Sequence, residues 1–152
     1  MKFIKVLRPW QWAKNILVVI PALLNKPFSL INIENAFLGF VLFSIFVSGN
    51  YILNDISDIE NDKAHPQKKF RPIANGSIDI KTAKIYSFIL ISLSSIGFYY
   101  FFDFAVLYLL IYLIFSILYT NYLKFNFIVN SLAISFFFLI RLFLGGFITQ
   151  IE

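Results

Sequence analysis

Three aspartates near the middle of the chain are spaced so that a helix would carry them on one face. Residues 54–62 read N-D-I-S-D-I-E-N-D, which places Asp55, Asp58 and Asp62 three and four residues apart, and helical side chains at those spacings are neighbours. Asn54 lies four residues before Asp58 and shares this face approximately. Mg²⁺ takes oxygen ligands, usually one or two carboxylates completed by substrate phosphates and water. The spacing therefore predicts a magnesium site formed by these four side chains.

A basic cluster follows the aspartates directly, with His65, Lys68, Lys69 and Arg71. Lysine and arginine donate charge-assisted hydrogen bonds to phosphate oxygens, so the whole segment suits a diphosphate carried by Mg²⁺. The alternative is a solvated connection between helices. The helical register of the aspartates, the adjacent bases and two X-Pro pairs that fix the backbone argue against it. A lone histidine such as His65 is more often structural or solvent-facing than a ligand.

The composition is that of an integral membrane protein. Of the 152 residues, 59% are hydrophobic and only 14% are charged, against about a quarter charged in soluble domains, and the mean hydropathy is +0.78. The absence of cysteine excludes disulfides and thiolate chemistry, and the single histidine argues against a zinc site. The basic residues alternate with apolar blocks instead of forming one stripe, which predicts no nucleic-acid partner.

Long apolar blocks predict an all-α fold, a polytopic transmembrane helix bundle with about five spans. The clearest blocks are residues 36–53, 85–102, 104–122 and 127–148, and a spanning helix needs about 20 residues. The first block, residues 16–24, is shorter, so that span must recruit residues 10–15 or continue through Pro27, with a kink or tilt near Pro21. Residues 1–152 are interpreted as a single membrane domain.

The distribution of lysine and arginine predicts the orientation, because cytoplasmic connections carry the excess of these residues. With the amino terminus inside, one basic residue, Lys26, lies outside and one, Arg141, lies within the last span. The inner segments then hold Lys2, Lys5, Arg8, Lys14, Lys63, Lys68, Lys69, Arg71, Lys81, Lys84 and Lys124. This bias places the amino terminus and an Asp-rich loop, residues 54–84, on the cytoplasmic side, with the chain ending outside.

Arg141 is unusual because it falls inside an apolar block. An arginine in a span costs about 2.5–3.5 kcal/mol on insertion scales, and such residues usually face a bundle interior or a polar cavity. One interpretation is that Arg141 reaches the outer interface or pairs structurally with a neighbouring helix. The other is that it lines an anion-binding cavity.

Three sequence blocks resemble one family. The N-D-x-x-D-x-x-x-D element, continued by H-P-x-K-K-x-R-P-I-A-N-G, resembles the first Asp-rich motif of the UbiA-type prenyltransferase superfamily. The opening L-R-P-W-Q-W-A-K-N (residues 7–15) is similar to its decaprenyl-phosphate phosphoribosyltransferase branch. Y-T-N-Y-L-K (residues 119–124), followed by Arg141 and the pair Gly145 and Gly146, also resembles that branch. The blocks occur in the family's order along nearly the whole chain.

The resemblance implies a fold of about nine transmembrane helices, of which this chain would be half. It further implies a cavity open to the cytoplasm and the lipid, Mg²⁺ as cofactor, and transfer of 5-phosphoribosyl from phosphoribosyl diphosphate to a polyprenyl (decaprenyl) phosphate. The setting would be cell-wall precursor synthesis at a bacterial plasma membrane. Asp55, Asp58 and Asp62 would then be catalytic through Mg²⁺. The residues expected to bind substrate phosphate are Lys14, Lys68, Lys69, Arg71, Tyr119, Lys124 and Arg141.

Two departures from the family pattern keep alternatives open. The chain holds about five spans, so a carboxy-terminal half is expected as a missing partner. At the second Asp-rich motif it has Asn130, which can coordinate Mg²⁺ but brings no charge. One alternative is ordinary prenyl transfer from a prenyl diphosphate to an aromatic acceptor, since both donors present the same Mg²⁺-diphosphate. The other is an inactive fragment or a non-enzymatic membrane protein.

Overall fold

The protein is helical throughout the part that the computed structural model describes, residues 2–25, 27 and 29–150, and no strand occurs there. The α-helices are α1 (Lys2–Leu7), α2 (Ile20–Leu24), α3 (Leu30–Ser57), α4 (Ile59–Ala64), α5 (Ile80–Phe102), α6 (Val106–Asn121) and α7 (Phe127–Ile148). Short 3₁₀ segments complete the chain: η1 (Pro9–Val18), η2 (Lys68–Phe70), η3 (Asp103–Ala105) and η4 (Leu123–Phe125). The predicted all-α fold is confirmed.

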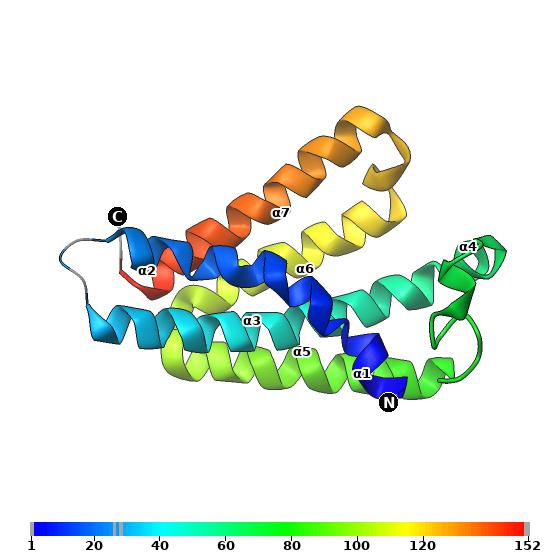
Figure 1. Cartoon of the computed structure of the whole chain (residues 1–152), viewed down its shortest axis with the longest axis horizontal. Coiled ribbons are helices and arrows are strands. Elements are labelled where there is room, and N and C mark those ends of the chain that lie inside the picture. Colours follow the sequence, from blue (N-terminus) through cyan, green and yellow to red (C-terminus); the bar gives the residue numbers. More distant parts are fainter. Residues whose placement is uncertain (1, 26, 28, 151–152) are drawn as a thin grey trace.

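The long helices α3, α5, α6 and α7 run alternately in opposite directions (Figure 1). α3 and α5 lie side by side along their length, and Ser87 of α5 donates a hydrogen bond to the carbonyl of Gly49 on α3 at 2.8 Å. Small residues such as these let helices approach closely. α6 and α7 diverge from this pair toward the end that carries α4 (Figure 1). We call it the aspartate end, because Asp55, Asp58 and Asp62 lie there.

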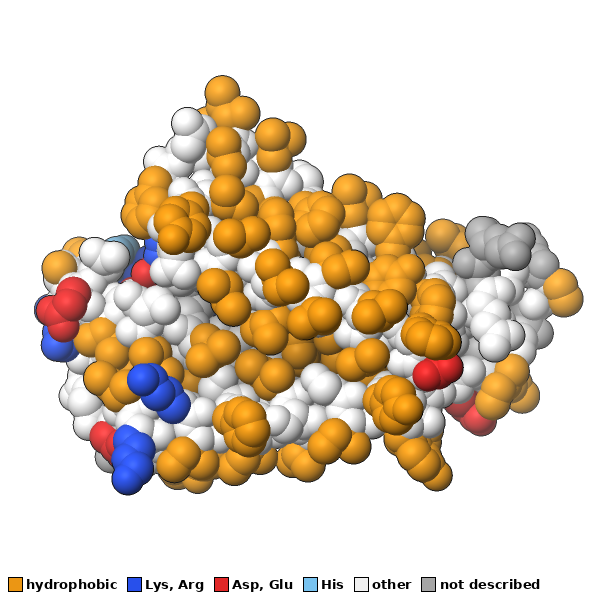
Figure 2. Space-filling model, turned by 180° about the vertical axis from the view of Figure 1, so that it is seen from behind, with side chains coloured by type: hydrophobic (Ala, Val, Ile, Leu, Met, Phe, Trp, Pro, Cys, Tyr) orange, Lys and Arg blue, Asp and Glu red, His pale blue; other side chains and the backbone are white. Residues whose placement is uncertain are grey.

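Three helical segments are long and apolar enough to cross a membrane: Leu30–Ser57, Ile80–Asn121 and Phe127–Ile148. The second contains α5 and α6, which fold back on each other at η3, so it passes along the bundle twice. Hydrophobic side chains cover the middle of the molecule, and charged ones gather at its ends (Figure 2). An apolar surface of this extent is suited to lipid. The protein is therefore an integral membrane protein.

The first predicted span is η1 followed by α2, and its break lies at Val19. Pro21 does not kink a continuous helix. It occupies the first turn of α2, where its missing N–H costs no helical hydrogen bond. The remaining predicted spans agree closely with the structure, and the block at residues 127–148 coincides with α7.

η1 packs tightly between α3 and α7. Asn15 donates a hydrogen bond to Ser44 of α3 at 3.1 Å. On the other side, a Cβ added to Gly145 of α7 would lie 2.3 Å from the carbonyl oxygen of Val18, which is closer than real Cβ atoms come to backbone. Only glycine allows this contact without separating the two segments. It places Lys14 and Asn15 against the bundle.

Aromatic side chains form the centre of the core between α3 and α6. Phe43 and Phe46 are fully buried and pack edge-on against Tyr112, with ring centroids 5.3 and 6.0 Å apart. Edge-to-face pairs of this kind are the favoured aromatic geometry. The contact holds the middle of α6 against α3. The apolar blocks of the sequence did not indicate that these two helices pack together.

Residues 54–84, which the sequence predicted to be a loop, are partly helical. α3 continues through Ser57 because its backbone hydrogen bonds extend past the apolar block, and α5 begins at Ile80. Asp79 precedes α5 and accepts a hydrogen bond from the Thr82 N–H at 2.9 Å. Hydrogen bonds from Thr82 hold the pKa of the Asp79 carboxyl below its usual value. The irregular part is limited to the chain between α4 and α5.

Candidate active site

The three aspartates lie where α3 ends and α4 begins. Asp55 is on the last turns of α3, Asp58 separates the two helices with φ −97° and ψ 9°, and Asp62 is on α4. Asp55 and Asp62 are only 3% and 2% exposed. Carboxylates at this depth need partners, because an unpaired buried charge is costly. All three lie at one end of the bundle, but the helix is interrupted at Asp58, so the single helical face predicted for them is not formed.

Asp55 and Asp62 share a guanidinium. Arg71 Nη1 lies 3.1 Å from Asp55 Oδ1 and 2.6 Å from Asp62 Oδ2. Arg8 also pairs with Asp55 Oδ1. Arg8 has φ 52° and ψ 54°, an uncommon left-handed conformation at the junction of α1 and η1, and it precedes a proline, which disfavours the right-handed helical region. The result is a four-residue cluster of two buried acids and two half-buried bases.

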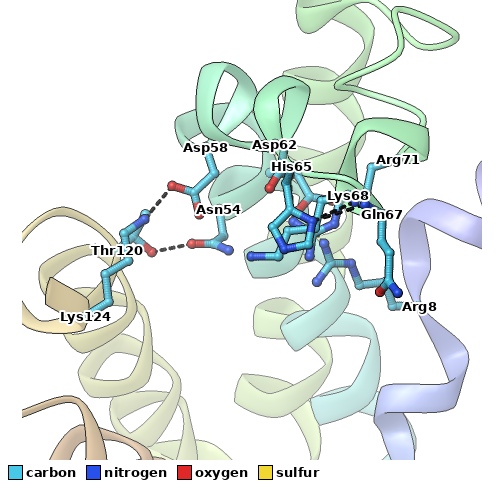
Figure 3. A network of polar contacts seen from close by, with 11 residues as sticks. Arg8, Asn54, Asp58, Asp62, His65, Gln67, Lys68, Arg71, Thr120 and Lys124 are labelled. Atoms are coloured by element: carbon cyan, nitrogen blue, oxygen red, sulfur yellow. Dashed lines mark hydrogen bonds and ion pairs between the residues drawn. The ribbon is translucent and has the colours of Figure 1, made fainter. Parts of the chain in front are cut away.

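Asp58 and Asn54 turn toward the other side, to α6 and η4 (Figure 3). Asp58 forms an ion pair with Lys124. One turn earlier, Thr120 donates a hydrogen bond to Asn54 Oδ1 at 2.7 Å. These two contacts join the carboxyl end of α3 to the carboxyl end of α6 and to η4. The predicted magnesium ligands are thus divided into two sets, Asn54 with Asp58 and Asp55 with Asp62.

The remaining basic residues of the motif are exposed. The side chains of Lys68 and Lys69 make no ion pair with any residue that the structure describes. His65 accepts hydrogen bonds at Nδ1 from the backbone N–H groups of Gln67 and Lys68, at 3.1 and 3.2 Å. It therefore stabilises the turn, in keeping with the structural role expected of it. The lysines stay accessible to an anion.

A cavity of about 240 Å³ lies between η1, α3, α6 and α7. Asn54 and Thr120 line it beside the Asp58–Lys124 pair, and Arg141 lines it farther inside. Lys14 from η1 also lines it, as do Asn50 and Ser116. Both of its charged lining residues are basic. The cavity therefore favours an anion, and it connects to the aspartate end through Asn54.

Arg141 is 4% exposed and contacts only neutral groups. Its Nε donates to Asn15 Oδ1 at 2.9 Å, Nη2 to the Tyr112 hydroxyl at 3.2 Å, and Nη1 to the Phe137 carbonyl. Its guanidinium also lies over the ring of Phe43 at 5.6 Å, a cation–π contact. Arg141 thus faces the bundle interior and a cavity, which excludes the interpretation that it reaches the outer interface.

The donor atoms present fit a Mg²⁺ ion that is shared with substrate phosphates. No three His, Cys, Asp or Glu side chains in the described ranges gather closely enough to hold a metal by themselves. Asn54 and Asp58, however, present an amide and a carboxylate on the same side, and Asn54 Oδ1 retains a second lone pair beside its bond from Thr120. Mg²⁺ needs only one or two such ligands when phosphates and water complete its shell.

Tyr119 and Asn130 contact each other. The Tyr119 hydroxyl lies 2.9 Å from Asn130 Oδ1 and donates a hydrogen bond to it, linking α6 to α7. Tyr119 also lines the cavity, whereas Asn130 does not. The second-motif position therefore does not line the cavity and contacts a lining residue, Tyr119.

Several site residues were absent from the sequence prediction. Arg8 and Thr120 pair with motif residues, and Asn15 and Tyr112 hold Arg141. Arg8, Asn15 and Thr120 all fall within the blocks that carry the family resemblance, which was the available signal. Tyr112 had none, because an aromatic residue in an apolar helix looks like any core residue.

The chain belongs to the UbiA prenyltransferase family, a family of transferases, with residues 16–152 matching. The decaprenyl-phosphate phosphoribosyltransferase of Mycobacterium tuberculosis is 32% identical over 153 residues, which cover 97% of this chain and 51% of that protein. The protein of the same name from Corynebacterium glutamicum is 40% identical over 94 residues, covering 60% of this chain and 28% of that one. The suspected family is confirmed.

The fold is also similar to a solved structure, a UbiA homologue from Archaeoglobus fulgidus bound to DMAPP and Mg²⁺. The TM-score is 0.84 at 19% sequence identity, over 100% of this chain and 56% of that one. This likeness confirms a UbiA-type helical bundle. The chain spans about half the length of the relatives it matches.

Proposed function

We propose that this chain supplies the donor-binding half of a Mg²⁺-dependent transferase. The reaction moves 5-phosphoribosyl from phosphoribosyl diphosphate to a polyprenyl phosphate such as decaprenyl phosphate, and its product feeds cell-wall precursor synthesis. The observation that carries the proposal is the meeting of Asn54, Asp58 and Lys124 beside a cation-lined cavity. The names of the two bacterial relatives support the choice of substrates.

In the proposed complex, carboxylates and cations of the ligand-free protein exchange partners. The Asp58 carboxylate leaves Lys124 for the metal, and the Lys124 ammonium turns to the donor's diphosphate. Lys68 and Lys69 are free to join it, and Arg71 contributes the donors that Asp55 and Asp62 do not use. When bound, Mg²⁺ supplies positive charge that offsets the charge on the leaving diphosphate. Asn54 and Asp58 would hold the metal in place.

The chemistry needs no strong protein base. A phosphate oxygen of the polyprenyl phosphate forms a bond to the anomeric carbon of ribose as the bond from that carbon to diphosphate breaks. The products are polyprenyl-phosphoryl phosphoribose and diphosphate. The attacking phosphate is already ionised at neutral pH, which agrees with a site whose only histidine caps a turn. The protein's main contribution is to position the reactants and stabilise charge.

The test is a transfer assay in membranes containing the chain, alone and together with a polypeptide matching the second half of the Mycobacterium tuberculosis relative. Labelled phosphoribosyl diphosphate and decaprenyl phosphate should give a lipid-soluble labelled product that requires Mg²⁺. Asp58→Ala should abolish it, because it removes the carboxylate next to the cavity. Glu60→Ala is the control, since that side chain is 84% exposed. Full turnover by Asp58→Ala contradicts the assignment.

A second candidate is prenyl transfer from a prenyl diphosphate to an aromatic acceptor. It is favoured by the DMAPP bound to the Archaeoglobus fulgidus homologue, whose fold this chain shares. The same membranes, given labelled prenyl diphosphate and an aromatic acid, decide between the two. Label in the aromatic product, with none transferred from phosphoribosyl diphosphate, selects this candidate.

We further propose that the amino terminus and the aspartate end face the cytoplasm of a bacterial plasma membrane, as the eleven basic residues counted on that side indicate. The chain has no cysteine, so single cysteines report the topology directly. Lys69→Cys should react with a membrane-impermeant thiol reagent only after lysis, and Asp103→Cys in intact cells. The reverse pattern would invert the orientation.

A further inference from the structure

The cations of the site fall into two groups that differ in their neutralisation. Arg8, Arg71 and Lys124 each pair with an aspartate. Lys14 and Arg141 form no ion pair with any described residue, and no acid lines the cavity that they share. An unneutralised charge inside an apolar bundle is costly, and this cost falls on Arg141, which is buried, whereas Lys14 is exposed. Arg141 therefore lacks an anion that no described residue supplies, and Lys14 lines the same cavity.

Arg141 retains hydrogen-bonding capacity toward the cavity. A guanidinium has five N–H donors, and three of them bind Asn15, Tyr112 and Phe137. Two remain on a side chain that is 4% exposed and lines the cavity. Its neutral partners fix the guanidinium in place without neutralising it. This is a preorganised donor pair of the kind that recognises phosphate oxygens.

The inner cation is well separated from the diphosphate position. Thr120 lines the outer part of the cavity near Lys124, and Tyr112, the partner of Arg141, lies two turns deeper on α6. Eight helical residues span about 12 Å at 1.5 Å each. One diphosphate bound at Asp58 and Lys124 cannot also satisfy Arg141 over that length. The geometry calls for a second anionic group.

We propose that Lys14 and Arg141 form a second subsite that binds a phosphate monoester. The inference rests on the proposed function, in which the diphosphate occupies the aspartate end. Two reactants carry such a group: the donor, as its 5-phosphate, and the polyprenyl phosphate acceptor. A prenyl diphosphate has no second phosphate and would place its apolar chain against both cations. The cavity of about 240 Å³ exceeds the roughly 150 Å³ that accommodates benzene.

The test measures binding without turnover and without Mg²⁺. Purified chain in lipid nanodiscs is titrated with labelled ribose 5-phosphate and, separately, with a short-chain prenyl monophosphate. Lys14→Gln and Arg141→Gln should each weaken binding of at least one probe about tenfold or more, as expected for a lost hydrogen bond to a charged group. Lys81→Gln removes a charge from the exposed side of α5 and should bind as the unmodified chain.

The two probes identify the source of the phosphate. A loss confined to ribose 5-phosphate assigns the subsite to the donor, and a loss confined to the prenyl phosphate assigns it to the acceptor. Lys14→Gln keeps the test valid if Arg141→Gln fails to fold, because the Lys14 side chain is exposed, lines the cavity and forms no ion pair with any described residue. Unchanged binding of both probes in Lys14→Gln and in a folded Arg141→Gln overturns the proposal, as does failure of the unmodified chain to bind either probe.

A matched variant separates this result from the proposed function. Asp58→Asn removes charge from the diphosphate position and should leave ribose 5-phosphate binding unchanged, because that probe has no diphosphate. If it weakened binding as strongly as Lys14→Gln, the two subsites would be one site and the proposal would be wrong. Loss of transfer activity in Asp58→Ala together with normal monophosphate binding supports both proposals independently.

Discussion

The aspartate end and the inner end of the cavity hold basic side chains in opposite electrostatic situations. At the aspartate end, Arg8 and Arg71 lie against two nearly inaccessible carboxylates. At the inner end, Arg141 is 4% exposed, less than the 14% and 26% of the Arg8 and Arg71 side chains, and it has only neutral partners among the described residues. The most buried of the three arginines is thus the one that no described acid neutralises. The difference indicates that Arg8 and Arg71 contribute to the fold in the absence of ligand, whereas Arg141 has no acidic partner among the described residues.

The largest expected effect comes from breaking the paired region. Asp55→Ala leaves Arg8 without a counter-ion in a site where both side chains are at most 14% exposed. Removing one partner of a buried pair should cost about 3–5 kcal/mol of unfolding free energy. Thermal unfolding in detergent measures the loss. The control is Glu60→Ala, whose pair with Lys63 is exposed and should contribute less than about 1 kcal/mol. Equal unfolding of the two variants would contradict a folding role for the cluster.

An intermediate effect should follow from separating the segments that bring the inner cations together. Gly145→Ala places a Cβ 2.3 Å from the Val18 carbonyl oxygen, a backbone atom that cannot rotate away. Overpacking of this kind costs about 1–3 kcal/mol. It should also weaken monophosphate binding, because η1 carries Lys14 and α7 carries Arg141.

The matched control is Gly97→Ala on α5. There the nearest atom to the added Cβ is a terminal carbon of the Leu42 side chain at 2.9 Å, which can move. Unfolding and binding measured together check the comparison. If Gly97→Ala were as harmful as Gly145→Ala, the η1–α7 approach would have no special importance.

The two regions were also unequally predictable from the sequence. The spacing of Asp55, Asp58 and Asp62 and the apolar block that became α7 could be identified, because each depends on residues near one another in the chain. The ion-pair partners of these aspartates could not be identified from the sequence. Asp58 pairs with Lys124 and Asp55 with Arg8, contacts made across 66 and 47 residues. They depend on which helices pack together, and the periodicity of a uniformly apolar helix does not encode that.

Arg141 lies between these cases. Its place in an apolar block identified it as unusual, because residues of this kind usually face a bundle interior or a polar cavity. The sequence left two interpretations open, however, because the residues near Arg141 in the chain do not indicate whether a neighbouring helix carries an acidic side chain facing it. Asn15, 126 residues away, turned out to be its partner, and it brings no charge. The structure was needed to show that no described residue neutralises this cation.

The smallest expected effect is the most informative about that cation. Arg141→Met removes a charge whose burial costs about 2.5–3.5 kcal/mol, and it leaves the buried Asn15 amide oxygen without its donor, which costs about 1–3 kcal/mol. These changes oppose each other, so the unfolding free energy should fall by no more than about 0.5 kcal/mol while monophosphate binding is lost. Thermal unfolding beside Asp55→Ala provides the comparison. A loss as large as that of Asp55→Ala would make Arg141 a structural residue like Arg8, and the contrast between the two ends would disappear.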